Sequence, residues 1–304
     1  MTRASIPTTM GLESTPRANV GKASSKGMDV AMDLDFNLTP KWWLKGMANF
    51  TYATSKYETY EEPKYISQLD GETIYLDNLT HVGRSLSQQW GFIAERLFVD
   101  DKDAANSPLQ SFGTYGGGDI KYRDINMDGQ ITDLDKAPIG YPTVPEIVYG
   151  FGFSTGYKGF DFSIFFQGLA RRSFWIDARA TSPFVGDQRL LLQAYADDHW
   201  SEENRDIYAL WPRLSPTVNE NNSQTSTWFM RNGALLRIKQ VEMGYTLPKG
   251  VMSKLHLSNA RIYLNSNNLF TFSNFKLWDI EMGGNGLAYP IQRVTNLGIN
   301  ISFK

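Results

Sequence analysis

Hydrophobic and polar residues alternate with a period of two along several stretches of the chain. In NLGINISF near the C-terminus, the hydrophobic side chains occupy every second position: Leu297, Ile299, Ile301 and Phe303. The same alternation runs through VAMDLDFNL (30–38), YGFGFSTGY (149–157) and GFDFSIFFQG (159–168), where Phe165 interrupts it. Because successive side chains of a β-strand point to opposite faces, these stretches predict strands with one hydrophobic and one polar face.

Further strands and their connections follow from composition. Strands are also predicted at residues 41–57, 88–97, 234–247 and 260–271. Short turn segments lie at 38–41, 157–159 and 247–250, whereas long segments rich in Asn, Asp, Gly and Pro occupy 58–87, 98–146, 171–233 and 272–290. Strands that are joined by short turns at one end and by long loops at the other are typical of an outer-membrane β-barrel.

The chemistry of the two faces separates the candidate architectures. A soluble β-sandwich also alternates, but its outer face carries Lys, Glu and Thr and its strands are shorter. Here the polar faces carry Asp, Asn, Ser, Gln and Gly, which suit a wet lumen, and the other faces are rich in Phe and Tyr. The predicted fold class is therefore all-β, a transmembrane antiparallel β-barrel, with a sandwich or soluble barrel as the alternative.

Composition excludes several function classes. The net charge of −2 over 304 residues gives no electrostatic footprint for nucleic acid. Cysteine is absent, which excludes disulfides and cysteine-based zinc sites, and the three histidines are far apart in sequence. The N-terminal stretch MTRASIPTTMGLESTP has no apolar core of the kind found in a secretory signal. Adjacent acidic pairs such as Asp197 and Asp198 do not predict a catalytic pair, so no enzyme activity is expected.

The stretch DINMDGQITDLD (124–135) has the spacing of a calcium-binding loop. Oxygen ligands are expected at the first, third, fifth, seventh and twelfth positions, which are Asp124, Asn126, Asp128, Gln130 and Asp135. The flanking segments carry Gly and Pro where an EF-hand has helices, so the prediction is an EF-hand-like loop that holds a structural Ca²⁺ ion. The alternative is an Asx-rich turn that satisfies its own backbone and binds no metal.

Aromatic residues gather in the segment 171–233. They stand among Arg, Asp and Asn and comprise Trp175, Trp200, Tyr208, Trp211 and Trp228. Exposed rings beside hydrogen-bonding groups are one way to bind a sugar, but aromatic residues more commonly pack a loop. Packing is the favoured interpretation, and no cargo-contacting residue can be named from the sequence.

Several separate segments resemble one protein family over essentially the whole chain. They include NVGKASSKGMDV (19–30), HVGRSLSQQWGFIAERLF (81–98), STWFMRNGALLRIKQVEMGYTLPKG (226–250), ARIYLNSNNLFTFSNFKLWDIEMG (260–283) and YPIQRVTNLGINISF (289–303). The run from 116 to 175, which contains the calcium-type loop, resembles the same family. Together they resemble the C-terminal third of SusC/RagA-type TonB-dependent outer-membrane transporters of Bacteroidetes.

This resemblance implies a barrel of about 22 strands, of which residues 1–304 would supply about eight to ten. It also implies import of glycans or other nutrient oligomers through the cell outer membrane. The implied partners are outer-membrane lipid, a SusD-like lipoprotein, TonB, and an oligosaccharide or peptide cargo. The segment 171–233 would be a long extracellular loop. A plug domain, a TonB box and a signal peptide are not recognised in this sequence, so the chain is expected to be a fragment.

A second function class remains open at this stage. A soluble calcium-dependent carbohydrate-binding β module would also contain alternating strands, a calcium loop and exposed aromatic rings. It would bury its hydrophobic strand faces in a dry interior, whereas a membrane barrel would leave them uncovered by protein. The direction in which these faces point therefore discriminates between the two hypotheses.

Overall fold

The computed structural model describes residues 2–3, 17–18, 21–69, 71–184 and 190–303. Most of the N-terminal stretch in which no signal was recognised lies outside the described residues. Two short strands from that region, β1 (Thr2–Arg3) and β2 (Arg17–Ala18), pair with each other.

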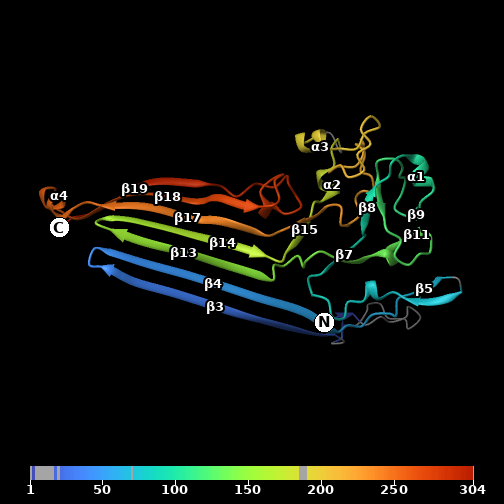
Figure 1. The fold of residues 1–304 in the computed structure, drawn as a ribbon, viewed down its shortest axis with the longest axis horizontal. Helices are drawn as coiled ribbons and strands as arrows, with labels where there is room; N and C mark the ends of the chain where they lie inside the picture. Colours follow the sequence, from blue (N-terminus) through green and yellow to red (C-terminus); the bar gives the residue numbers. More distant parts are fainter. Residues whose placement is uncertain (1, 4–16, 19–20, 70, 185–189, 304) are drawn as a thin grey trace.

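One antiparallel sheet of seven strands dominates the described chain (Figure 1). Its order is β19-β18-β17-β14-β13-β4-β3. Strands that are neighbours in the sheet are therefore also consecutive along the chain when these seven strands are counted alone. The edge strands are β3 and β19. The seven strands are β3 (Lys22–Thr39), β4 (Trp42–Thr59), β13 (Ile147–Tyr157), β14 (Phe160–Ala170), β17 (Leu235–Thr246), β18 (Leu257–Ser273) and β19 (Val294–Phe303).

The connections at one end of this sheet are short. The hairpin between β13 and β14 turns at Lys158 and Gly159, whose φ values of 49° and 93° match the mirror-image turn that suits the twist of paired strands. Strands β3 and β4 are joined through Pro40 and Lys41, and β17 and β18 through the helix α4 (Lys249–Lys254). The sequence-based prediction of short turns at one end is confirmed.

The long connections lie together at the opposite end (Figure 1) and contain only short elements. The strands there are β5 (Ile66–Leu69), β6 (Glu72–Tyr75), β7 (Gln89–Gly91), β8 (Ala94–Leu97), β9 (Leu109–Gln110), β10 (Ile120–Tyr122), β11 (Gln130–Ile131), β12 (Ala137–Ile139), β15 (Ser173–Trp175) and β16 (Met230–Asn232). The helices are α1 (Asp101–Ala105), α2 (Ala178–Thr181), α3 (Gln193–Asp197), η2 (Asp77–Leu79), η3 (Asp133–Asp135) and η4 (Ile280–Met282). Among the described residues, no helix is both long and apolar enough to span a membrane.

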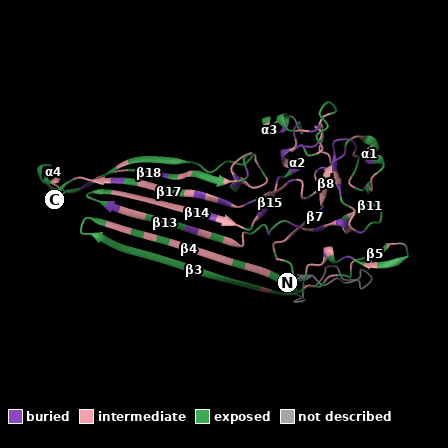
Figure 2. Cartoon of the chain, in the orientation of Figure 1, coloured by how far each residue is buried: buried purple, intermediate pink, exposed green. Residues whose placement is uncertain are grey.

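The hydrophobic face of the sheet is uncovered. Its side chains include Met28 (55% exposed), Phe153 (45%) and Leu297 (76%). Buried residues instead gather in the loop region (Figure 2). This distribution is opposite to that of a β-sandwich, in which the strand faces form the core.

The strand predicted at 88–97 is present as two short strands that lie outside the large sheet. The segment 88–97 forms β7 and β8, which pair with the loop strands β12 and β10 and do not join the large sheet. Neighbouring residues there are buried together, as at Leu97 and Phe98, because they enter the core of the loops rather than a two-faced sheet. The large sheet therefore has seven strands among the described residues, fewer than the eight to ten expected.

Candidate functional site

The polar face of the sheet carries a cluster of charged side chains near the short turns. Arg261 on β18 donates through Nε to Asp161 Oδ2 at 3.0 Å and through Nη2 to Asp161 Oδ1 and to Glu242 Oε1, the latter at 2.7 Å. Gly244 makes room for this guanidinium, since a Cβ built there would lie 2.3 Å from Arg261 Nη2. One cation with two carboxylates leaves this cluster with a net negative charge on the polar face.

Glycines on the polar face accommodate large rings from neighbouring strands. Phe165, which interrupts the alternation of its strand, lies over Gly150 and Gly152, where an added Cβ would come within 2.9 Å of its ring. Trp43 covers Gly156 in the same way. Phe165 is a bulky apolar residue on the polar face of β14. The glycines of β13 explain it, because a side chain at Gly150 or Gly152 would occupy the space that the Phe165 ring fills.

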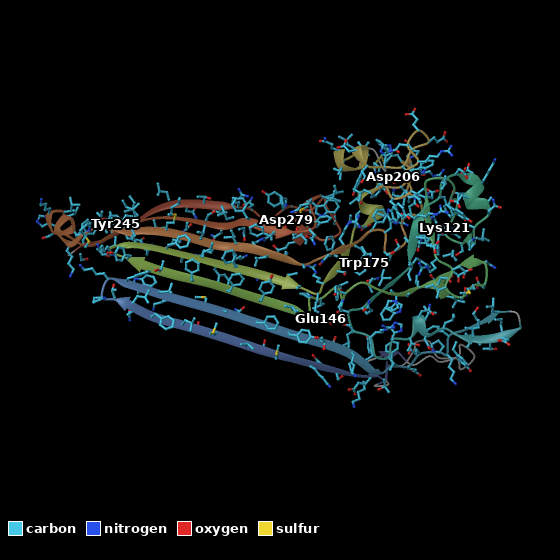
Figure 3. The ribbon with its side chains drawn as sticks, viewed as in Figure 1. Lys121, Glu146, Trp175, Asp206, Tyr245 and Asp279 are labelled. Atoms are coloured by element: carbon cyan, nitrogen blue, oxygen red, sulfur yellow. The ribbon has the colours of Figure 1, made fainter. Side chains whose placement is uncertain are left out.

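A second ionic contact joins the polar face to the loop between β18 and β19. Arg237 on β17 is 3% exposed and pairs with Asp279, at 3.2 Å, and with Glu281. Its Nε also donates to Thr271 Oγ1 at 2.9 Å. Figure 3 shows Asp279 at the loop end of the sheet and Tyr245 at the opposite end. Arg237 therefore fixes the loop between β18 and β19 to the strands.

The three long connections of the large sheet share one hydrophobic core. They are the first loop (60–146, between β4 and β13), the second loop (171–234, between β14 and β17) and the third loop (274–293, between β18 and β19). Its buried members from the first loop are Phe92, Leu97, Ile120, Tyr122 and Ile131; those from the second are Phe174, Ile176, Ala178, Tyr195, Trp200, Ala209, Trp211 and Phe229; and those from the third are Phe275 and Ile280. Trp211 stacks on Tyr195 with ring centroids 4.1 Å apart. The prediction that these aromatics pack is confirmed for Trp200 and Trp211, whereas Tyr208 is 68% exposed.

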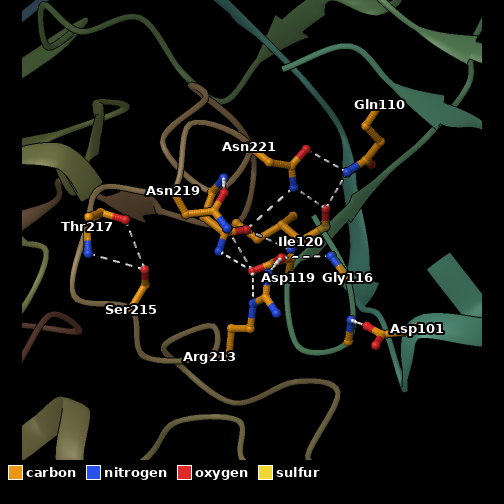
Figure 4. A network of polar contacts seen from close by, with 12 residues as sticks. Asp101, Gln110, Gly116, Asp119, Ile120, Arg213, Ser215, Thr217, Asn219 and Asn221 are labelled. Carbon is orange, nitrogen blue, oxygen red and sulfur yellow. Dashed lines mark hydrogen bonds and ion pairs between the residues drawn. The ribbon is translucent and has the colours of Figure 1, made fainter. Parts of the chain in front are cut away.

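A buried polar network ties the first two loops together (Figure 4). Asp119 is fully buried, and its two carboxylate oxygens accept hydrogen bonds or ion pairs from Gly116 N, Arg213, Asn219 and Asn222 at 2.7–3.1 Å. Burial raises the pKa of Asp119, while Arg213 and the hydrogen bonds oppose that shift. This carboxylate holds together segments that are about a hundred residues apart.

Amide side chains extend the network. Gln110 Nε2 donates to Asn221 Oδ1 at 2.6 Å, and Gln110 Oε1 accepts from Tyr122 N at 2.7 Å. The hydroxyl of Tyr122 donates to Asn221 O at 2.6 Å, and burial raises the pKa of that phenol. This network was not predicted from the sequence. The available signal was Asp119 directly before an apolar strand together with the polar run NENN at 219–222.

The predicted calcium ligands lie in one tight loop between β10 and η3. Asp124 Oδ2 accepts from Gly129 N at 2.8 Å, and Asn126 Oδ1 accepts from Asp128 N at 3.3 Å. Asp128 Oδ1 accepts from Gln130 N at 2.9 Å, while Asp124 Oδ1 is buried without a hydrogen-bond partner.

The last predicted ligand, Asp135, faces the backbone of the same loop. It is fully buried and accepts from the N–H groups of Ile125, Asn126 and Thr132 at 2.8–3.3 Å. Burial raises the pKa of Asp135, and these three donors oppose the shift. Within the described residues, His, Asp and Glu side chains form no group of three or more that could hold a metal. The calcium site stays a prediction, and the loop closes on itself through its own side chains.

An ion pair stabilises the start of α1 in the first loop. Asp103 accepts from Arg96 at 2.5 and 2.9 Å, and from Val99 N at 3.0 Å. These donors, chiefly Arg96, lower the pKa of Asp103 to about 2. Asp100 caps the same helix by accepting from Asp103 N at 2.9 Å.

Comparison with known proteins gives consistent relatives. No protein-family model matches the chain. TonB-dependent receptor P26 of Formosa agariphila is 30% identical over 201 residues, which are 61% of this chain and 20% of that protein. TonB-dependent receptor P3 of the same organism is 23% identical over 310 residues, which are 94% of this chain and 29% of that protein.

Solved structures agree in fold. The structure of the RagAB peptide transporter superposes with a TM-score of 0.69 at 20% identity, over 99% of this chain and 31% of that chain. RagAB in its open-open state gives a TM-score of 0.70 at 18% identity. The chain spans about a third or less of the length of these relatives. Their names describe receptors and transporters, which agrees with the expectation that the chain is not an enzyme. The chain is therefore similar in sequence to TonB-dependent receptors and in fold to RagAB, in agreement with its resemblance to SusC/RagA-type transporters.

Proposed function

We propose that this chain is part of the outer-membrane barrel of a TonB-dependent importer of nutrient oligomers. The observation that carries the proposal is the uncovered hydrophobic face of the seven-stranded sheet, which includes Met32 (51% exposed), Phe153 (45%) and Ile299 (62%). A soluble protein rarely exposes a contiguous apolar surface of this extent, whereas acyl chains would cover it in a bilayer. The polar opposite face would line the lumen.

The orientation follows from the lengths of the connections. Outer-membrane barrels have short periplasmic turns and longer extracellular loops. The turn at Lys158 and Gly159 would therefore face the periplasm, and the loop unit that contains residues 171–233 would face outward. Because the three loops share one core and a buried polar network, they would form a single extracellular body rather than independent flexible segments.

The cargo is proposed at the level of class. RagAB is described as a peptide transporter, and the family resemblance adds oligosaccharides as a second cargo class. A SusD-like lipoprotein would cover the outer mouth, and TonB would act on a part of the protein outside this chain. Ca²⁺ would be a structural ion in the loop 124–135, where the unpartnered Asp124 Oδ1 is the feature that supports it.

Cell fractionation of the full-length protein tests the location. The protein is expected in the outer-membrane fraction, to need detergent for extraction, and to migrate faster on a gel before heating than after it. Recovery in the aqueous fraction without detergent would contradict the proposal and favour the soluble calcium-dependent carbohydrate-binding module. Uptake of labelled peptides and oligosaccharides, compared between strains with and without TonB, then distinguishes the two cargo classes.

A further inference from the structure

A groove on the hydrophobic face lies beside the short turns. It has a volume of 540 Å³, which falls within the range of roughly 300–1,000 Å³ typical of ligand sites. Its lining includes Asp161, whose carboxylate pairs with Arg261, and Gly244, both on the polar side of the sheet. The other lining side chains are Trp42, Thr155, Tyr157, Phe160, Phe162 and Met243. All six project from the hydrophobic face, since Trp42 pairs with Tyr157 and Phe162 pairs with Thr155 in the strand register.

The groove lies over a small residue, Thr155, that is flanked by large aromatic side chains. Thr155 lies between two strands that present aromatic rings, and its hydroxyl accepts the indole N–H of Trp42 at 3.0 Å and donates to Trp43 O at 2.9 Å. The hydroxyl of Thr155 is therefore satisfied by the protein, and the indole of Trp42 is held in place. An alkyl chain can therefore lie over Thr155 without leaving that hydroxyl unpaired.

The rim next to the groove is uniformly basic. The charged residues of the three short connections are Lys41, Lys158, Lys249 and Lys254, and none of these connections contains Asp or Glu. Lys158 N donates to Lys41 O at 3.4 Å, so the two turns that flank the groove lie side by side. The ammonium of Lys158 lies 5.0 Å from the ring centroid of Tyr157, a wall of the groove.

These lysines have no anionic partner in the described part of the chain. The lysines that do form ion pairs there are Lys22, Lys45 and Lys136. Lysines at a membrane surface attract anionic lipid headgroups, each by an amount that corresponds to about fivefold in binding.

We propose that this rim binds a phospholipid with an anionic headgroup, whose phosphate meets Lys41 and Lys158 and whose acyl chain occupies the groove over Thr155. The inference rests on the proposed membrane location. It adds a specific lipid partner on the side of the barrel that faces the inner leaflet of the outer membrane, and it assigns the aromatic groove to that lipid rather than to cargo.

Native mass spectrometry of the full-length protein in detergent tests the proposal, with phosphatidylglycerol and phosphatidylcholine added separately. Wild-type protein is expected to retain phosphatidylglycerol preferentially. The double variant Lys41→Gln/Lys158→Gln should lose that preference, with about a fivefold decrease in bound phosphatidylglycerol for each lysine. Lys276→Gln, in the loop at the opposite end of the sheet, is the matched control and should behave like wild type.

A second variant tests the acyl-chain part. Thr155→Phe fills the groove and should lower retention of both lipids while leaving the lysines in place. Equal retention of the two lipids by the wild type, or unchanged phosphatidylglycerol binding in the double variant, would overturn the proposal. In that case the protein would still fractionate with the outer membrane. A protein found in the aqueous fraction would instead refute the membrane function on which the inference rests.

Discussion

A charge placed on the exposed face of β13 gives a direct test of where that face points. The strand has 11 residues, about the number that crosses a bilayer at the usual tilt, and Phe153 lies next to its centre. Phe153→Arg would place a guanidinium against acyl chains near the midplane, where such substitutions cost about 2–4 kcal/mol. This corresponds to roughly a 30- to 1,000-fold change in the folding equilibrium.

Two controls isolate the effect of the charge. Phe153→Ala removes the ring contact with Phe162, whose centroids are 5.8 Å apart, and should cost about 0.5–1.5 kcal/mol for that pair in addition to lost burial. Ser154→Arg puts the same charge on the polar face, one residue further along, and should cost less than about 1 kcal/mol because that face meets water.

The assay is denaturant unfolding of the full-length protein in phospholipid vesicles, followed by tryptophan fluorescence. The expected order of destabilisation is Phe153→Arg, then Phe153→Ala, then Ser154→Arg. If Ser154→Arg proved as damaging as Phe153→Arg, the apolar side chains of the sheet would not face lipid, and the argument from exposure would fail.

Two further outcomes follow from side-chain contacts. Gly244→Ala should displace Arg261 from its two carboxylates and lower stability by about 1–3 kcal/mol, whereas Gly250→Ala, whose added Cβ meets nothing within 4 Å, should change thermal unfolding little. The folded-state pKa of Asp103 is about 2, below its unfolded value, so its contribution is present above about pH 4 and disappears as pH falls toward 2. Arg96→Met should raise that pKa toward its unfolded value, so the variant should be less stable at neutral pH and should lose less stability between about pH 4 and 2 than the wild type, as measured by unfolding at a series of pH values.

The long strands were predictable because a single local rule determines them. A strand with one hydrophobic and one polar face must alternate, and YGFGFSTGY forms residues 149–157 of β13 with this pattern. The exception at Phe165 could not be interpreted from its own strand, because the space for its ring is provided by Gly150 and Gly152 on the neighbouring strand. The register between β13 and β14 brings these residues together, and this register cannot be read from the sequence.

The loop unit was predictable only in part. Burial of Trp200 and Trp211 agrees with a general preference of aromatic rings for packing, but their neighbours come from other loops. The partners of Asp119 lie about a hundred residues away, so no spacing rule within one segment reveals the network. The sequence also did not predict that the strands within 88–97 lie outside the large sheet, since their burial is set by contacts with distant residues such as Thr225 and Thr227.

The Asp and Asn residues of the loop 124–135 have two physical explanations. Their side chains either brace the turn by themselves or hold a Ca²⁺ ion that braces it further. An ion bound only to the folded state stabilises it by about 2.7 kcal/mol when its concentration is about 100 times its Kd. Calcium is therefore expected to raise the unfolding temperature of the full-length protein, and excess EDTA to lower it.

The variant Asp128→Ala distinguishes the ion from the turn. This residue accepts a backbone hydrogen bond from Gln130, so its loss should lower stability with or without calcium, and the decisive quantity is the calcium-dependent difference in unfolding temperature. That difference should vanish in Asp128→Ala and persist in Asp133→Ala, whose side chain is 83% exposed and pairs with Lys136. If wild-type protein shows no calcium-dependent difference, the hydrogen bonds of Asp124, Asp128 and Asp135 suffice to hold the loop, and the ligand spacing reflects turn geometry alone.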